Sequence, residues 1–248
     1  MQNFAGCAVV GKRERQEDFY AFLPIDNNAL LAILADGMGG HVGGAEASRI
    51  AANAVIEHFT RAAIHSPLSP EILQAANHAI ADQIKNDESL AGMGCTLVAA
   101  LIDGGGVQWL SVGDSLLYVF ADGRLKKINA DHSLGGMLDK AAADGKITMA
   151  QAADNPQRHA LYSALMGDEI ALIDQGEMAF DPASPPLLLV ASDGLLTLSE
   201  ADIADCLRRL ENDAADKIAA ALVQEVESHN APHQDNTTVL VIKPLGRQ

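Results

Sequence analysis

The sequence predicts an α+β fold in which two antiparallel β-sheets are stacked and pairs of helices cover both outer faces. Short apolar or alternating segments, separated by Gly, Pro, Asn and Asp, are typical of antiparallel strands. Segments with helical periodicity come in pairs instead of alternating with single strands. Runs of strands followed by runs of helices favour stacked layers over repeated β-α-β units.

The predicted strands form three groups. They cover residues 4–10, 19–23 and 29–35, then 95–102, 107–112, 116–120 and 125–128, and finally 187–191 and 237–242. In the second group the connections are short and contain Gly and Asp, which favour tight turns. We therefore expect these four strands to form a meander of antiparallel hairpins.

The predicted helices are marked by apolar residues at helical spacing. They cover residues 45–62, 72–84, 199–210 and 213–226. Ser69 is expected to cap the second of these and Ser199 the third, with Asp202 completing a capping box. Asn212 or Asp213 is expected to cap the fourth.

A Gly- and Ala-rich stretch at residues 134–168 differs from the rest of the chain. It contains two short helical patterns, at residues 138–143 and 148–154, the second opened by a Thr148–Gln151 capping box. We interpret this stretch as an inserted flap subdomain. The chain as a whole, residues 1–248, is interpreted as one domain, because no repeat or low-complexity linker divides it.

Composition excludes several classes of function. The chain has 248 residues, of which 48% are hydrophobic, and a net charge of −16, which disfavours nucleic acids and anionic membrane surfaces as partners. No apolar run is long enough to span a membrane, and the N-terminal segment lacks the charge order of a signal peptide. Cys7, Cys95 and Cys206 form no CxxC pattern, so we expect reduced thiols in a cytoplasmic protein.

Acidic residues lie at the ends of several predicted strands. Asp36 and Asp193 each end an unbroken apolar run, typical of a strand buried on both faces, where a carboxylate is costly to desolvate unless a cation meets it. Lys and Arg are scarce around most of these acids, and hard oxygen donors suit Mg²⁺ or Mn²⁺. The further acids near strand ends are Glu17, Asp18, Asp114 and Asp235.

Other Asp-Gly pairs have a simpler interpretation, because Asp-Gly is a favoured turn dipeptide. Asp122 stands at hairpin spacing and Asp144 lies in the flap, so both are predicted turns. Asp103 follows an apolar run, and local context leaves it open. The glycine-rich loop at residues 39–44 lacks the nucleotide-binding patterns and is interpreted as backbone that closely approaches a metal ion.

Seven short motifs follow one another along the chain, at residues 13–18, 35–41, 94–96, 112–115, 131–133, 192–194 and 235–238. Their order and spacing resemble those of the metal-dependent Ser/Thr protein phosphatases of type 2C, in particular the bacterial branch. The resemblance covers almost the whole chain. It implies the two-sheet fold described above and hydrolysis of phosphoserine and phosphothreonine in proteins.

The resemblance also implies a core site for two Mn²⁺ or Mg²⁺ ions. Asp36 would bridge the two ions, and the Gly37 carbonyl would bind one of them. Asp193 and Asp235 would complete the other site. A hydroxide between the ions would attack phosphorus directly, without a phosphoenzyme.

Other roles are implied in the same way. Glu17 and Asp18 would hold metal-bound waters, and Asp114 together with Asp193 would hold a third ion. Arg13 would bind the substrate phosphate, since its planar guanidinium matches phosphate oxygens.

The chain departs from the family pattern at four places. Met38 stands where some members have a His that acts as general acid, and a thioether cannot donate a proton. Metal-bound water or another residue must then protonate the leaving group; His41 is one candidate, and the alternative for His41 is a structural role in its loop. Gln16 replaces an Asn, the acid of the glycine-rich loop is shifted to Glu46, and Leu116 replaces an Arg.

The expected function is a phosphoprotein phosphatase that acts as a monomer and opposes a bacterial, eukaryotic-like Ser/Thr kinase. Met38 and the altered loops leave open a phosphopeptide-binding regulatory pseudophosphatase. A hydrolase of small phosphate esters is the third interpretation, because it would use the same chemistry.

Overall fold

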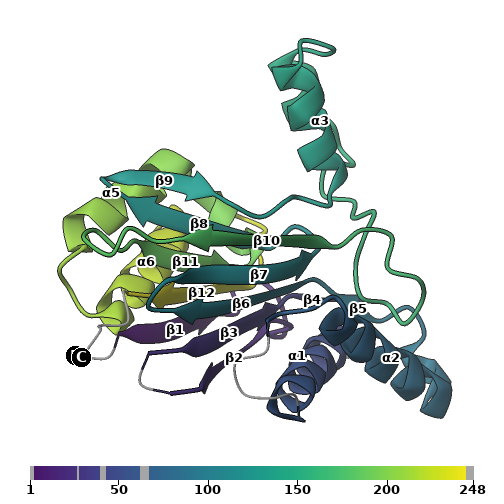
Figure 1. Ribbon diagram of the computed structural model, residues 1–248. Coiled ribbons are helices and arrows are strands. Elements are labelled where there is room, and N and C mark those ends of the chain that lie inside the picture. Colours follow the sequence, from purple (N-terminus) through teal and green to yellow (C-terminus); the bar gives the residue numbers. More distant parts are fainter. Residues whose placement is uncertain (1–2, 27, 40–42, 62–66, 244–248) are drawn as a thin grey trace.

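The computed structural model (Figure 1) describes residues 3–26, 28–39, 43–61 and 67–243. Two five-stranded antiparallel sheets make up its centre. The first has the order β1 (Phe4–Val9), β12 (Thr237–Ile242), β11 (Leu187–Ala191), β8 (Leu116–Ala121) and β9 (Arg124–Lys127). The second has the order β10 (Asp174–Ala179), β7 (Gly106–Val112), β6 (Leu97–Asp103), β3 (Leu30–Ala35) and β2 (Phe19–Pro24).

Helices cover both outer faces of this sandwich. Helices α1 (Gly43–Arg61) and α2 (Glu71–Asn86) pack on the second sheet, and α5 (Glu200–Leu210) and α6 (Ala215–His229) pack on the first. The predicted α+β sandwich with paired helices is therefore confirmed. No helix of the described residues combines the length and apolarity needed to cross a membrane.

The central strands are buried on both faces, which explains their unbroken apolar runs. In β3, Leu31 and Ile33 belong to the core beneath α1 and α2, whereas Leu30 and Leu34 belong to the core between the sheets. Strands β11 and β12 divide their side chains in the same way. An acidic residue adjoins each of these three strands. Asp36 follows β3, Asp193 follows β11, and Asp235 lies shortly before β12.

The predicted meander is wrong at its middle connection. Strands β6 and β7 form a hairpin, as do β8 and β9, but β7 and β8 belong to different sheets. Gly113 allows this crossing, because its φ of +101° suits glycine and a Cβ there would lie 2.5 Å from Thr96. The crossing carries Asp114 from one sheet to the other.

Strand β10 was not predicted. Three of its six residues, Asp174, Gln175 and Glu177, are polar, so the segment has no clear apolar alternation. It forms because it pairs with β7 at the edge of the second sheet, where Gly176 lies against the Trp109 ring. The short pair β4 (Gly37–Met38) and β5 (Gly94–Cys95) was not predicted either.

Helix caps are confirmed in part. The capping boxes of Ser199 and Thr148 are present. The predicted cap of α2 is wrong, because Pro70 and not Ser69 is the N-cap of this helix. The predicted cap of α6 is wrong, because Ala214 is its N-cap and Asp213 pairs with Lys217 at 2.6 Å.

The flap contains two helices, α3 (Leu134–Ala143) and α4 (Met149–Ala153). Figure 1 shows α3 extending away from the sheets. It begins four residues earlier than the predicted 138, because Ser133 Oγ accepts a hydrogen bond from Gly136 N and caps it. Cys7, Cys95 and Cys206 are free thiols.

Candidate metal centre

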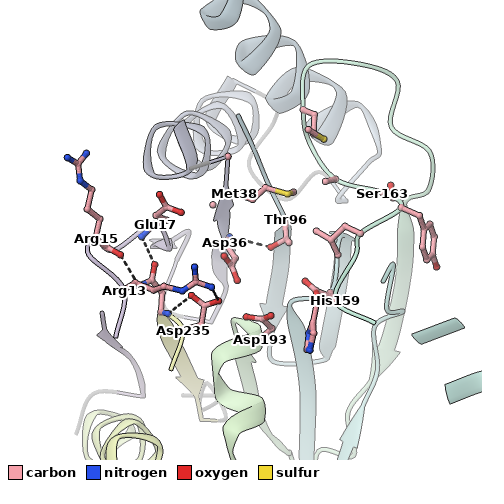
Figure 2. Close-up of a pocket in the computed structure, with 18 of the residues that line it drawn as sticks. Arg13, Arg15, Glu17, Asp36, Met38, Thr96, His159, Ser163, Asp193 and Asp235 are labelled. Carbon is pink, nitrogen blue, oxygen red and sulfur yellow. Dashed lines mark hydrogen bonds and ion pairs between the residues drawn. The ribbon is translucent and has the colours of Figure 1, made fainter. Parts of the chain in front are cut away.

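Both sheets deliver acidic side chains to one edge of the sandwich. Asp36 follows β3 and Asp18 precedes β2 in the second sheet, while Asp193 follows β11 and Asp235 precedes β12 in the first. Asp114 lies on the crossing between the sheets. Figure 2 shows Asp36, Asp193 and Asp235 facing the same part of one cavity.

Asp36 is held firmly by its neighbours. Its backbone N donates to Thr96 Oγ1 (3.3 Å), its carbonyl accepts from Thr96 N (2.8 Å), and Thr96 Oγ1 also bonds Ser115 Oγ (2.7 Å). Burial raises the pKa of the Asp36 carboxyl well above its usual value, and the nearby charge of Asp18 raises it further. Asp193, Asp114 and Asp235 act in the same direction.

Asp18 has one oxygen without a partner. Its Oδ2 accepts hydrogen bonds from Ser192 Oγ (2.8 Å) and Thr238 Oγ1 (2.7 Å) of the first sheet. Its Oδ1 is buried and bonds nothing in the described structure. An unpaired buried carboxylate oxygen is costly, so this atom indicates a place for a water or a cation.

Two further carboxylates are largely buried from solvent in the same cavity. Burial raises the pKa of Asp114 to about 7, with a smaller effect from the charge of Asp193. Burial also raises the pKa of Asp193 to about 6, and the charge of Asp235 acts in the same direction. These carboxylates repel one another at neutral pH, which favours binding of a cation between them.

Arg13 supplies a positive charge at the edge of this cluster. Its Nη2 lies 2.6 Å from Asp235 Oδ2, and both side chains are partly exposed. Asp235 Oδ1 accepts from Asn236 N (2.8 Å). The Arg13 guanidinium therefore contacts a predicted metal ligand.

Glu17 and Gly37 lie next to each other at the cavity. Gly37 N donates to Glu17 O (3.2 Å), and Glu17 N donates to Asn236 Oδ1 (2.7 Å). Burial raises the pKa of the Glu17 carboxyl. Gln16, which stands in place of the family Asn, accepts from Asp18 N through its Oε1 (3.0 Å) and donates from Nε2 to Val9 O (3.2 Å).

Asp103 stands apart from this cluster. His41 lies outside the described residues. Asp103 forms a turn, because its Oδ1 accepts from Gly105 N (2.7 Å) and Gly106 N (2.9 Å), and it does not line the cavity.

The cavity has a volume of about 910 Å³ and two walls of different origin. Figure 2 shows Arg13 and Arg15 on one side and His159 and Ser163 on the other. The second wall, residues 159–171, was missed by the sequence analysis. It carries no motif, and tertiary contacts hold it at the cavity, among them the pairing of Leu161 with Ser133 and of Leu165 with Cys95.

The donor set fits hard divalent cations. No three His, Cys, Asp or Glu side chains within the described ranges already stand together as a closed metal-binding group. Mg²⁺ commonly takes only one or two protein carboxylates and keeps several waters, so an open cluster suits it better than a closed cage. The unpaired Asp18 oxygen and the carboxylates of Asp36 and Asp193 are the oxygen donors available to such an ion.

The fold and the site define an α-β-β-α sandwich protein with an acidic centre suited to divalent cations. The model of the family described as "Protein phosphatase 2C" matches residues 6–227. The chain belongs to this family.

Several relatives support this membership. The Ser/Thr phosphatase stp of Listeria welshimeri is 29% identical over 239 residues, 93% of this chain and 91% of that protein. PstP of Mycobacterium tuberculosis is 35% identical over 145 residues, 57% of this chain, and that match spans only 27% of the relative. A crystal structure of the PstP catalytic domain with two manganese ions has a TM-score of 0.74 at 27% identity, covering 97% of this chain and 96% of that one.

Proposed function

We propose that the protein is a metal-dependent phosphatase that hydrolyses phosphoserine and phosphothreonine in proteins. The observation that carries the proposal is the convergence of carboxylates from both sheets on one cavity, with a buried Asp18 oxygen left unpaired. Family membership and the names of the relatives, which are Ser/Thr phosphatases, support the substrate class.

Two Mn²⁺ or Mg²⁺ ions are the cofactors of this proposal. Asp36 would contact both ions, the Gly37 carbonyl one of them, and Asp193 and Asp235 would complete the second site. The manganese ions in the related PstP structure support this number. When bound, such ions lower the pKa of a water between them and stabilise charge on phosphoryl oxygens.

The remaining site residues have supporting roles in the proposal. Asp18 and Glu17 would hold waters of the ions, and Asp114 with Asp193 would hold a third ion. Arg13 would bind the substrate phosphate with its planar guanidinium, on the wall next to Asp235. Binding there aligns phosphorus with the carboxylate centre before reaction.

The leaving serine or threonine oxygen needs a proton. Met38 lines the cavity and cannot supply one. His41 stays our candidate for this role. His159 also lines the cavity, on the wall to which the second half of the flap contributes, and brings an imidazole to the same space.

The organisation of the chain is part of the proposal. We infer one phosphatase domain, residues 1–248, with a flap at residues 134–168 that reaches the cavity through its second half. The protein would act as a monomer on phosphorylated proteins, opposite a bacterial Ser/Thr kinase.

Phosphate release from a phosphothreonine peptide tests the proposal. Release that requires Mn²⁺ and stops with a chelator is expected, and Asp193→Asn should lower the rate by about 10³-fold or more because a metal ligand is lost. Met38 favours one other function, a regulatory pseudophosphatase. In that case the peptide would bind the Mn²⁺-loaded protein, and no phosphate would appear.

A further inference from the structure

Gln234 lies directly before Asp235, and its side chain is almost fully buried, with 4% exposed. Its Nε2 donates to the carbonyl oxygens of Gly194 (3.1 Å) and Asp235 (3.2 Å) and to Thr237 Oγ1 (3.0 Å). Its Oε1 accepts from Thr197 Oγ1 (2.7 Å). The side chain thus joins the 3₁₀ turn η2 (Asp193–Thr197) to the segment before β12.

The orientation of this amide is determined by its partners. Two of the oxygens facing Nε2 are carbonyls, which only accept hydrogen bonds, and Thr237 Oγ1 donates to Asp235 O (3.3 Å). Reversing the amide would place Oε1 against these acceptors. A primary amide fits here because its nitrogen donates hydrogen bonds on one side and its oxygen accepts a hydrogen bond from the Thr197 hydroxyl on the other.

The Gln234 amide links β11 and β12 beyond the point where their backbone hydrogen bonds end. Strands β11 and β12 pair up to Ala191, and the bond from Ser192 N to Thr238 O (3.1 Å) extends the pairing by one step. Beyond that point the chain diverges to carry Asp193 and Asp235 to the cavity. Gln234 bridges the two diverging segments directly behind both carboxylates.

The same residue also contacts the wall that carries Arg13. The backbone carbonyl of Gln234 accepts from Lys12 N (2.8 Å), the residue before Arg13. Gly11 packs so closely on this carbonyl that a Cβ would lie 2.6 Å from it. Residue 234 therefore connects three segments of the site.

We propose that Gln234 is a positioning residue that sets the separation of the Asp193 and Asp235 carboxylates for a divalent cation. The proposal rests on the proposed metal role of these two residues. Residues that support metal ligands from behind are commonly worth about 10–100-fold in metal affinity. A residue needed only for folding would change stability without a selective loss of metal binding.

The test is the dissociation constant for Mn²⁺, measured by isothermal titration calorimetry without substrate. Gln234→Met keeps the length of the side chain and removes all four bonds, so we expect Mn²⁺ binding about 10–100-fold weaker. Gln234→Glu adds a negative charge, which by attraction alone would tighten Mn²⁺ binding, yet we expect weaker binding here as well.

A matched control is a buried amide that bonds the second wall of the cavity and none of the proposed metal ligands. Asn77 is a buried amide, 3% exposed, that bonds Asp168 O and accepts from Gly167 N (2.8 Å). Asn77→Leu should lower thermal stability and leave Mn²⁺ affinity within about twofold, since it supports no metal ligand.

Two results would overturn the proposal: an unchanged Mn²⁺ dissociation constant in folded Gln234→Met, or tighter binding in Gln234→Glu. If neither variant folds, Thr197→Val removes only the hydroxyl that supports Oε1, and unchanged Mn²⁺ affinity in that variant would overturn it equally. A wild-type protein that binds Mn²⁺ but releases no phosphate would contradict the proposed function and leave this inference standing.

Discussion

Arg13 pairs with the Asp235 carboxylate, so under the proposed function a divalent cation would compete with Arg13 for it. The pair is partly exposed, so its contribution is modest. We expect Arg13→Ala to tighten Mn²⁺ binding by about twofold to fivefold, while kcat/KM for a phosphopeptide falls about 10²-fold because a group that stabilises phosphoryl charge is lost. Arg13→Lys keeps the positive charge without the planar guanidinium, so its kcat/KM should lie between those of the wild-type protein and Arg13→Ala. Weaker Mn²⁺ binding in Arg13→Ala would contradict the competition.

Asp114 provides a test of the repulsion within the cluster. The pKa of its carboxyl in the folded protein is about 7, above the ordinary 3.8. Between these two pH values the folded state keeps a proton on Asp114 that the unfolded state has lost. The free energy of unfolding of the metal-free protein therefore falls as the pH rises from about 4 to 7. Above pH 7 it falls no further on account of Asp114. Asp114→Asn removes this loss.

In chelator at pH 8, Asp114→Asn should raise the free energy of unfolding by about 2–4 kcal/mol, and at pH 5 by less than half of that. Denaturant unfolding at the two pH values measures the difference. Asp154→Asn, an exposed acid outside the cavity, is the control and should change neither value. A gain that is larger at pH 5 than at pH 8 would show that the sign is wrong.

At the scale of elements, the sequence predicts best where burial determines the pattern. Strands β3, β11 and β12 are buried on both faces, so their apolar runs could be recognised without knowing their partners. Strand β10 could not, because it depends on pairing with β7 and not on its own pattern. The motifs predicted the acidic centre, whereas the wall at residues 159–171 follows from tertiary pairing that no local pattern encodes.

The two flap helices are predicted to be dispensable for folding. Leu134 N donates to Ala160 O (2.9 Å) and Gly135 N to Arg158 O (2.6 Å), so the first two residues of α3 already close the base of the helical hairpin. Between these points Ala152 is the buried hydrophobic residue, and Met137 and Met149 are exposed.

Replacing residues 136–157 by an Asn-Gly turn should therefore shift the Tm by no more than about 4 °C, measured by circular dichroism. Mn²⁺ affinity, measured on the same sample, should stay within about twofold. Loss of cooperative unfolding in this variant would mean that the flap belongs to the core of the domain.

At the scale of the whole molecule, a net charge of −16 and a buried acidic centre make metal binding and folding stability interdependent. A ligand that binds only the folded state stabilises it by mass action, about 2.7 kcal/mol at one hundred times its dissociation constant. We expect Mn²⁺ to raise the Tm of the wild-type protein and to have a much smaller effect on Asp36→Asn. An equal rise in both would place the binding site away from Asp36.

The central claim is that carboxylates from both sheets jointly hold divalent cations. Crystals grown with Mn²⁺, examined by anomalous diffraction, test it most directly. The account predicts two adjacent manganese peaks, both in contact with Asp36, with Asp193 and Asp235 on one of them. Manganese bound elsewhere on the molecule, or an empty space between these three side chains at saturating Mn²⁺, would contradict it.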